Sequence, residues 1–177
     1  MVFRARLLGL AFAGLAFLTV LPPAPAAGGQ TARLPVPKAD RVVVLKQERQ
    51  LILMRDDRVL RVFRVALGRY ATGPKREEGD ARTPEGEYTL DFKLEDSAFY
   101  KAIHISYPNQ RDLELARMRG VDPGGKIMIH GLPDNMSAAR VGHPALDWTQ
   151  GCIALTNREM DILWQMVDEG TPIEIHP

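Results

Sequence analysis

Short apolar runs separated by charged residues dominate the chain from residue 41 to residue 68. Three of them, RVVVLK, QLILMR and VLRVFRVAL, are rich in Val, Ile, Leu and Phe, and the polar stretches KQERQ and DDR interrupt them. This pattern predicts antiparallel strands joined by tight turns. Alternation in the third run is imperfect, so its buried face is not assigned. Residues 70–82, YATGPKREEGDAR, are polar and glycine-rich and predict a mobile surface loop, a candidate lid.

The second half of the domain mixes further strands with two helical patterns. Strands are predicted at EYTLDFKL, KAIHISY, KIMIHG and TPIEIHP. A short helix is predicted over residues 109–119, with Asn109 as its N-cap and Gly120 as its stop. A second helix is predicted over residues 156–169, where Thr156 can cap the start. Its apolar side chains recur at three- and four-residue spacing and predict a stripe that faces the core: Met160, Leu163, Trp164 and Val167. A mainly β domain with one or two helices packed on it, α+β by content, is therefore expected.

The N-terminal segment carries the features of a secretory signal. Two arginines precede an apolar run over residues 7–21, and the small-residue sequence Ala-Pro-Ala ends at residue 26. The run is shorter than the roughly 20 residues that a membrane span needs, and two prolines end it. We therefore expect a cleaved signal peptide over residues 1–26 rather than a lasting membrane span, a linker over 27–40 and a single domain over 41–177.

Composition narrows the classes of partner and site. The formal net charge is +1, and removal of the two leader arginines turns it into −1, so no polycation for nucleic acid or for a membrane surface is present. One cysteine and four scattered histidines show none of the usual zinc-ligand spacings, so neither a metal site nor a cofactor is predicted.

The single cysteine, Cys152 in WTQGCIAL, is a candidate nucleophile. An exported protein with one cysteine cannot close an internal disulfide, so its thiol is inert and buried, paired between chains, or reactive. Cys152 stands shortly before the predicted helix start, where partial positive charge lowers a thiol pKa. Gly151 permits close approach of a substrate, and the N–H groups of Gly151 and Cys152 are candidate oxyanion donors.

A catalytic cysteine needs a base, and the chain offers four histidines. His130 ends a predicted strand just before Gly131, where its side chain can project over a site, and it ranks first. His143, in the loop before the cysteine, ranks second. His104 lies within a strand and His176 beside the C-terminal residue, where each has an ordinary structural explanation.

Three segments together resemble a known family. They are Ile129-His130-Gly131, then Thr149-Gln150-Gly151-Cys152-Ile153, and before both Thr83-Pro84-Glu85-Gly86-Glu87-Tyr88. They are similar to the motifs of the L,D-transpeptidase catalytic domain family (YkuD, or ErfK/YbiS/YcfS/YnhG), and the sequence HPALDWTQGCIALTN looks like a YafK-type branch. The resemblance implies a β-sandwich-like YkuD domain in the bacterial periplasm, and it covers residues 41–175.

The resemblance also implies a reaction and its partners. A family member's cysteine attacks the third residue of a peptidoglycan stem tetrapeptide, usually diaminopimelate. D-Alanine leaves, and an amine acceptor resolves the thioester. This assigns Cys152 as nucleophile and His130 as base, with Gly151, Gly131 and Thr149 in positioning roles. Two alternatives stay open: a hydrolase that uses water and cuts peptidoglycan–protein links, and a non-catalytic envelope domain. An envelope protein is thus a candidate acceptor or substrate.

The chain departs from the family pattern at two positions. Gln150 stands where many members have histidine, and Ala154 where most have arginine. Arg140 or Arg82 is a candidate replacement as the partner of a substrate carboxylate. Three other side chains are substrate-binding candidates: Trp148 as a stacking wall, His143, and Asp147, which is also a side-chain alternative to a backbone carbonyl near Gly131 for orienting His130.

Overall fold

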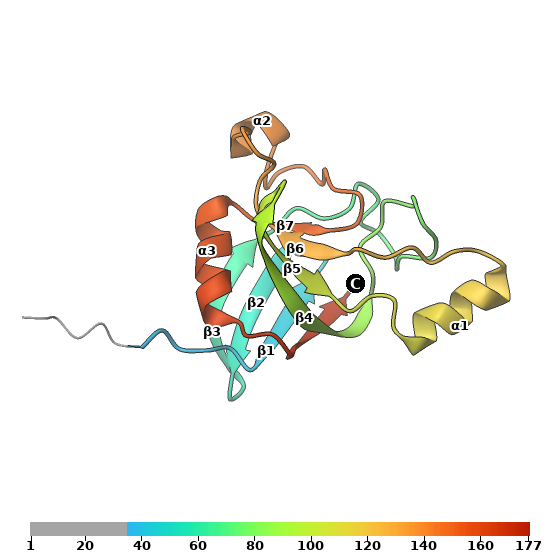
Figure 1. The fold of residues 1–177 in the computed structure, drawn as a ribbon, viewed down its shortest axis with the longest axis horizontal. Helices are drawn as coiled ribbons and strands as arrows, with labels where there is room; N and C mark the ends of the chain where they lie inside the picture. The colour runs from blue at the N-terminus through green and yellow to red at the C-terminus, as the bar shows by residue number, and fades with distance from the viewer. Residues whose placement is uncertain (1–34) are drawn as a thin grey trace, which may run out of the picture. The chain divides into compact units, whose positions relative to one another are not determined.

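One eight-stranded sheet forms the framework of the computed structural model, which describes residues 35–177 (Figure 1). The predicted signal peptide and most of the predicted linker lie outside these residues. Along the sheet the strand order is β3-β2-β1-β8-β4-β5-β6-β7. The strands are β1 Arg41–Leu45, β2 Gln50–Arg55, β3 Arg58–Arg64, β4 Gly86–Ser97, β5 Tyr100–Ile105, β6 Met128–His130, β7 Ile153–Ala154 and β8 Thr171–His176.

The sheet curls until its two ends meet. Beyond β3 the chain reaches Ala66, whose N–H donates to Ala154 O at 3.1 Å, while the N–H of Ala154 donates to Ala66 O at 2.8 Å. A further bridge joins Gly68 to Thr149. The predicted fold class, mainly β and α+β by content, is confirmed. The two facing layers of the expected β-sandwich are parts of one curled sheet. We call the contact of residues 66–68 with residues 149–154 the seam.

The burial of side chains explains why apolar and polar residues alternate clearly in β1 and β2 and imperfectly in β3. Val42 and Val44 in β1 and Leu51 and Leu53 in β2 are fully buried, so both strands alternate. β3 is an end strand of the sheet, and its register with β2 shifts after Leu53. Most of its side chains are exposed, which accounts for its imperfect alternation.

Three short helices complete the described chain: α1 Gln110–Arg119, α2 Ala138–Val141 and α3 Asn157–Met166. α3 supplies Met160, Leu163 and Met166 to the core, and Thr156 caps it as predicted. It ends earlier than predicted because Val167 is extended and its carbonyl accepts a 2.6 Å hydrogen bond from Lys93 Nζ. Figure 1 shows α1 far from α3, projecting beyond the sheet.

Each of the eight strands has one of its ends along the same edge of the sheet, the edge that runs across the strands. The register places Leu45 beside Gln50 and His176, Ile175 beside Gly86, and Ile129 beside Ile153. β1, β3, β5 and β8 therefore end, and the other four strands begin, at this edge. Because Cys152 directly precedes β7, we call it the Cys152 edge.

Candidate active site

Two neighbouring parallel strands hold the predicted nucleophile and base. β6 pairs with β7 through Ile129 with Ile153 and His130 with Ala154. His130 is thus the last residue of β6, and Cys152 stands immediately before β7. The predicted strand KIMIHG and the short strand that follows the cysteine bring the two residues together from positions far apart in the sequence.

The hydrogen bond of His130 defines its tautomer. Its Nδ1 lies 2.7 Å from Gly131 O, and a carbonyl oxygen only accepts, so Nδ1 carries the proton. Nε2 is left with a lone pair and can act as a base. Burial lowers the pKa of His130; the Gly131 carbonyl opposes this shift and the neighbouring His143 adds to it. His130 is therefore neutral at pH 7.

The thiol of Cys152 is also held in its neutral form. Burial raises its pKa above the ordinary value of 9.0, although the Met128 N–H and the Lys75 ammonium oppose the shift. Its Sγ also lies 3.8 Å from Lys126 O, to which the thiol donates. The expectation that the following helix lowers the thiol pKa is wrong. The backbone N–H groups of Thr156 and Glu159 at the start of that helix are already hydrogen-bonded, because the two residues form a reciprocal capping box.

A tight turn fixes the backbone before the thiol. Thr149 Oγ1 donates to Cys152 O at 2.7 Å and accepts from the Gly151 N–H at 3.1 Å. The Gly151 N–H is therefore occupied and is no longer a free oxyanion donor, contrary to expectation. The N–H of Cys152 donates to no group of residues 35–177, so it is the available donor.

The two glycines of the motifs are required by close approach. Gly151 has φ +130°, and a Cβ there would lie 2.7 Å from Arg82 O. A Cβ on Gly131 would lie 2.7 Å from Asn157 Oδ1 and 2.9 Å from Tyr100 Cβ. Both glycines thus position the site by allowing backbone to pack where a side chain cannot fit.

Aromatic rings cover the imidazole of His130. Phe99 lies 4.6 Å from it and Trp148 lies 5.7 Å from it, both measured between ring centroids. Trp148 thus borders the His130 imidazole with its ring tilted by 63°, and its contact with a substrate stays a prediction. Phe99 was missed by the sequence analysis. The sequence signal for Phe99 was the aromatic pair in SAFY, the short connection between two strands. An aromatic side chain at the tip of a hairpin can pack over another element.

Asp147 has partners other than those considered for it, while His143 lies near His130. Asp147 Oδ2 accepts from Arg49 Nη2 at 2.8 Å, and Oδ1 accepts from the Leu67 N–H at 3.0 Å. Asp147 therefore holds the seam, and neither His130 nor His143 is its partner. His143 is buried, and neither of its ring nitrogens has a hydrogen-bond partner among residues 35–177.

Arg82, one candidate replacement for the missing arginine, packs its backbone against Gly151 of the thiol motif. Arg140 is exposed on α2. Arg82 donates to Thr72 O within the 70–82 loop. Ala154 itself is fully buried in the seam, where it pairs with Ala66, and Gln150 is exposed. An arginine at 154 would have to fit into a closed backbone contact.

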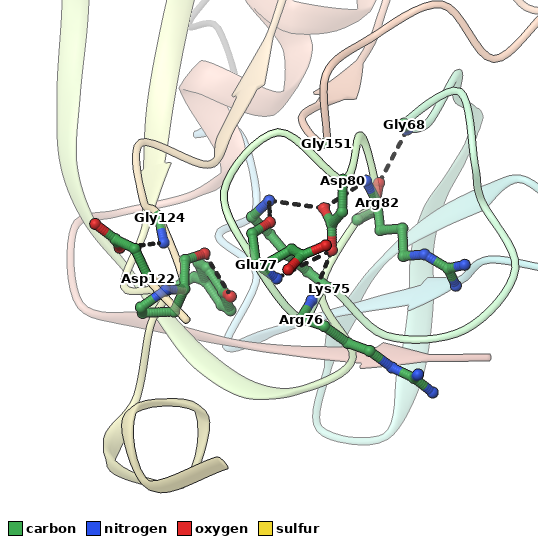
Figure 2. Close-up of polar contacts among 12 residues, drawn as sticks. Gly68, Lys75, Arg76, Glu77, Asp80, Arg82, Asp122, Gly124 and Gly151 are labelled. Atoms are coloured by element: carbon green, nitrogen blue, oxygen red, sulfur yellow. Dashed lines mark hydrogen bonds and ion pairs between the residues drawn. The ribbon is translucent and has the colours of Figure 1, made fainter. Parts of the chain in front are cut away.

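Hydrogen bonds and an ion pair among its own residues hold the 70–82 loop together (Figure 2). The Asp80 carboxylate accepts from Lys75 Nζ at 2.8 Å and from the Arg76 N–H at 2.7 Å, and two further backbone N–H groups of the loop also donate to it. The side chains of Lys75 and Asp80 are only 4% and 9% exposed. The composition of the loop predicts that its charged residues are solvated. The structure differs because Lys75 and Asp80 form a buried ion pair.

Backbone contacts join the 70–82 loop to the turn of the cysteine. A Cβ on Gly68 would lie 2.3 Å from Ala81 O and 3.0 Å from Gly151 Cα. Gly68, Gly151 and the end of the loop therefore pack backbone against backbone. The position of Cys152 thus depends on a loop that precedes it by some seventy residues.

Residues 35–177 hold no group of three or more His, Cys, Asp or Glu side chains placed to bind a metal ion. Within the same range, none of the helices has the length and apolar character needed to cross a membrane.

Comparisons with known proteins agree on one family. Residues 39–175 match YkuD, the L,D-transpeptidase catalytic domain. YafK of Escherichia coli (strain K12), provisionally named an L,D-transpeptidase, is 32% identical over 132 residues, which are 71% of this chain and 46% of YafK. YqjB of Bacillus subtilis (strain 168), also named provisionally, is 29% identical over 142 residues, 80% of this chain and 73% of YqjB.

Solved structures add a likeness of fold. The helical cell shape determining protein Pgp2 from Campylobacter jejuni has a TM-score of 0.59 and 27% identity, over 77% of this chain and 46% of Pgp2. An L,D-transpeptidase from Xylanimonas cellulosilytica, at 18% identity and a TM-score of 0.50, shares the fold. The chain thus spans about half the length of both YafK and Pgp2.

Proposed function

The chain belongs to the L,D-transpeptidase catalytic domain (YkuD) family, and we propose that it is a peptidoglycan L,D-transpeptidase with Cys152 as its nucleophile. The matches confirm the predicted family and agree with its YafK-like branch. The observation that carries the proposal is the pairing of β6 with β7, which sets a neutral His130 with a free Nε2 on the strand beside the thiol.

The first half of the proposed reaction is acylation. Cys152 Sγ attacks the carbonyl carbon of diaminopimelate in the stem tetrapeptide, and the thiol proton passes to His130 Nε2. The carbonyl oxygen becomes an oxyanion, which accepts the N–H of Cys152. When the intermediate collapses, the bond to D-alanine breaks, and His130 returns the proton to the leaving amine. A thioester on Cys152 remains.

The second half is transfer. An amine of a second stem peptide, or of an envelope protein, attacks the thioester carbonyl and gives its proton to His130. The C–S bond breaks, and the proton returns to the sulfur. Water in place of the amine gives hydrolysis with the same proton movements. The substrate places the enzyme outside the cytoplasm, in the periplasm, which accords with a predicted signal over residues 1–26.

A muropeptide assay tests this function. Purified disaccharide-tetrapeptide is incubated with the protein, products are separated by chromatography, and the protein is weighed intact. Transpeptidation gives cross-linked dimers, free D-alanine and a transient acyl adduct on Cys152. Tripeptides alone would mean hydrolysis. Absence of both products and of the adduct would rule out an acyl-enzyme.

The pH dependence of acylation follows from the state of His130. Its neutral form is the base, and its lowered pKa means that protonation requires a more acidic solution than for an ordinary histidine of pKa 6.5. We expect the acid limb of kcat/KM for D-alanine release to be centred below pH 6.5. An acid limb centred at or above pH 6.5 would contradict this assignment.

Asp147→Asn is the control for the pH experiment. The Asp147 carboxylate binds Arg49 and the Leu67 N–H, so its loss weakens the seam without changing the partner of His130. The variant is expected to unfold at a lower urea concentration and to keep the same acid limb. If the limb moves with Asp147→Asn, the carboxylate acts on the imidazole after all.

A further inference from the structure

The chain between β6 and β7 passes beside His130 and is tied to the domain near both of its ends. At the first end the Asp134 N–H donates to Ala98 O at 3.1 Å, and at the second the Asp147 carboxylate holds the seam. Residues 135–146 lie between these ties and include α2, which projects from the body of the domain in Figure 1. We call residues 135–146 the flap.

The flap is joined to the domain by very few contacts. Apart from the bond between the Met136 N–H and Pro133 O, the hydrogen bonds that it forms within residues 35–177 run between its own residues. Its surface is largely exposed, and the Leu146 side chain projects into solvent. His143, which is 8% exposed, is the buried residue of the flap. The flap therefore packs on the domain chiefly through this imidazole.

An imidazole without partners is an unusual choice for this packing position. Neither ring nitrogen of His143 has a hydrogen-bond partner among the described residues, and the same holds for the buried Nε1 of Trp148. A neutral imidazole carries one donor and one acceptor, and burying either of them unpaired costs free energy. An apolar side chain would fill the same space without that cost. The position is therefore typical of a group whose partner arrives with a substrate.

His143 and Trp148 both lie beside the proposed base, His130. The centroids of the Trp148 and His130 rings are 5.7 Å apart, and His143 is close enough for its charge to act on the His130 imidazole. Burial lowers the pKa of His143, and the carboxylate of Glu159 opposes that shift. His143 is therefore neutral at pH 7, as His130 is, and two neutral imidazoles stand next to each other.

The proposed transfer step has to remove two protons from its acceptor. At pH 7 an amine with the pKa of lysine is almost wholly protonated, and roughly one molecule in 2,500 is free to attack. When an ammonium becomes an amide, one proton ends on the sulfur of Cys152 and one leaves the site. His130 has a single free nitrogen, Nε2, because its Nδ1 is bound to the Gly131 carbonyl. His130 can therefore hold only one of these protons at a time.

We propose that His143 is a second base, which takes the first proton from the acceptor ammonium in the transfer step. This inference rests on the proposed function. The amine that is formed attacks the thioester carbonyl, and His130 Nε2 takes the second proton and returns it to the sulfur as the C–S bond breaks. His143 then gives its proton to solvent. The acceptor reaches the imidazole when the flap lifts, and this movement breaks no hydrogen bond between the flap and the described strands.

The test separates transfer from acylation. The acyl-enzyme is formed with disaccharide-tetrapeptide, and intact mass follows its decay after addition of disaccharide-tripeptide, which offers the acceptor amine but has no D-alanine to release. We expect His143→Gln to leave the rate of acylation within about twofold and to slow the decay at pH 7 by at least about tenfold. The deficit is expected to shrink at pH 9, where the free amine is roughly a hundredfold more abundant.

Hydroxylamine provides a second readout that a structural role of His143 would not move. It is already unprotonated at pH 7 and needs no base to become a nucleophile. We expect it to resolve the acyl-enzymes of the unaltered protein and of His143→Gln at rates within about twofold of each other.

Two further variants serve as controls. His176→Gln removes a histidine whose side chain is 51% exposed, and it is expected to change neither rate. His143→Phe replaces the unpaired nitrogens by apolar atoms, so it is expected to unfold at the same or a higher urea concentration and to show the same slow decay. If His143→Gln failed to fold, His143→Phe would take its place.

The outcomes distinguish this inference from the proposed function. Equal decay of the His143→Gln and unaltered acyl-enzymes would overturn the second base and leave the proposed function intact. A deficit that stayed the same at pH 9 and with hydroxylamine would make His143 a structural residue and would also overturn it. If no acyl-enzyme formed in the unaltered protein, the proposed function would be rejected, and the second base with it.

Discussion

Cys152→Ala is expected to abolish the acyl adduct and to lower the rate of D-alanine release by at least about 10³-fold. The chain has no second thiol that could replace Cys152. The buried imidazole of His130 has no acidic side chain bound to it that could serve as an alternative nucleophile, since its Nδ1 partner is a backbone carbonyl. The measurement is chromatography of the muropeptide products together with the intact mass of the protein.

Cys152→Ser is the matched comparison. It keeps the shape of the side chain and supplies a hydroxyl, which is a far weaker nucleophile beside a neutral base. A slow ester adduct with the serine variant, and none with the alanine variant, would place the chemistry on this side chain. Turnover by Cys152→Ala within tenfold of the unaltered protein would rule out the thioester.

Asp80→Asn is expected to lower the free energy of unfolding by about 3 kcal/mol. The substitution leaves the Lys75 ammonium, whose side chain is 4% exposed, without its counter-charge. An unpaired buried charge is far more costly than the loss of an exposed pair. Urea titration followed by tryptophan fluorescence measures the difference.

An exposed ion pair provides the control for Asp80. Lys38 and Asp168 lie 2.5 Å apart, and their side chains are 47% and 63% exposed. Lys38→Ala is expected to cost no more than about 1 kcal/mol. Equal losses for Asp80→Asn and Lys38→Ala would mean that the 70–82 loop carries no special share of the stability.

Most elements could be predicted because their sequence patterns arise from interactions between residues that are close in sequence. Alternation in β1 and β2, the caps of α1 and the capped start of α3 are all set by neighbours within a few residues. α2, with four residues, and β7, with two, are too short to show any period, so neither was predicted.

Features of the site that depend on distant partners escaped prediction. Asp147 looked free to orient a histidine, but Arg49, 98 residues away in sequence, binds it. The polar 70–82 loop was expected to be solvated, since composition counts charges without showing that Lys75 and Asp80 neutralise each other in the fold. Phe99 meets His130 because the β4–β5 hairpin carries it there.

The seam has a consequence for the order in which the protein acquires its site. Ala66 and Ala154 are far apart along the chain, so their contact closes a long loop, which costs conformational entropy. Contacts of high sequence separation slow folding, because the entropy of loop closure is lost before the contact stabilises the chain. The turn before Cys152 rests on Gly68 and bridges to it through Thr149, and hence the thiol turn is completed only when the first three strands dock on the last third of the chain. A chain in which this seam has not closed keeps the thiol outside its catalytic setting.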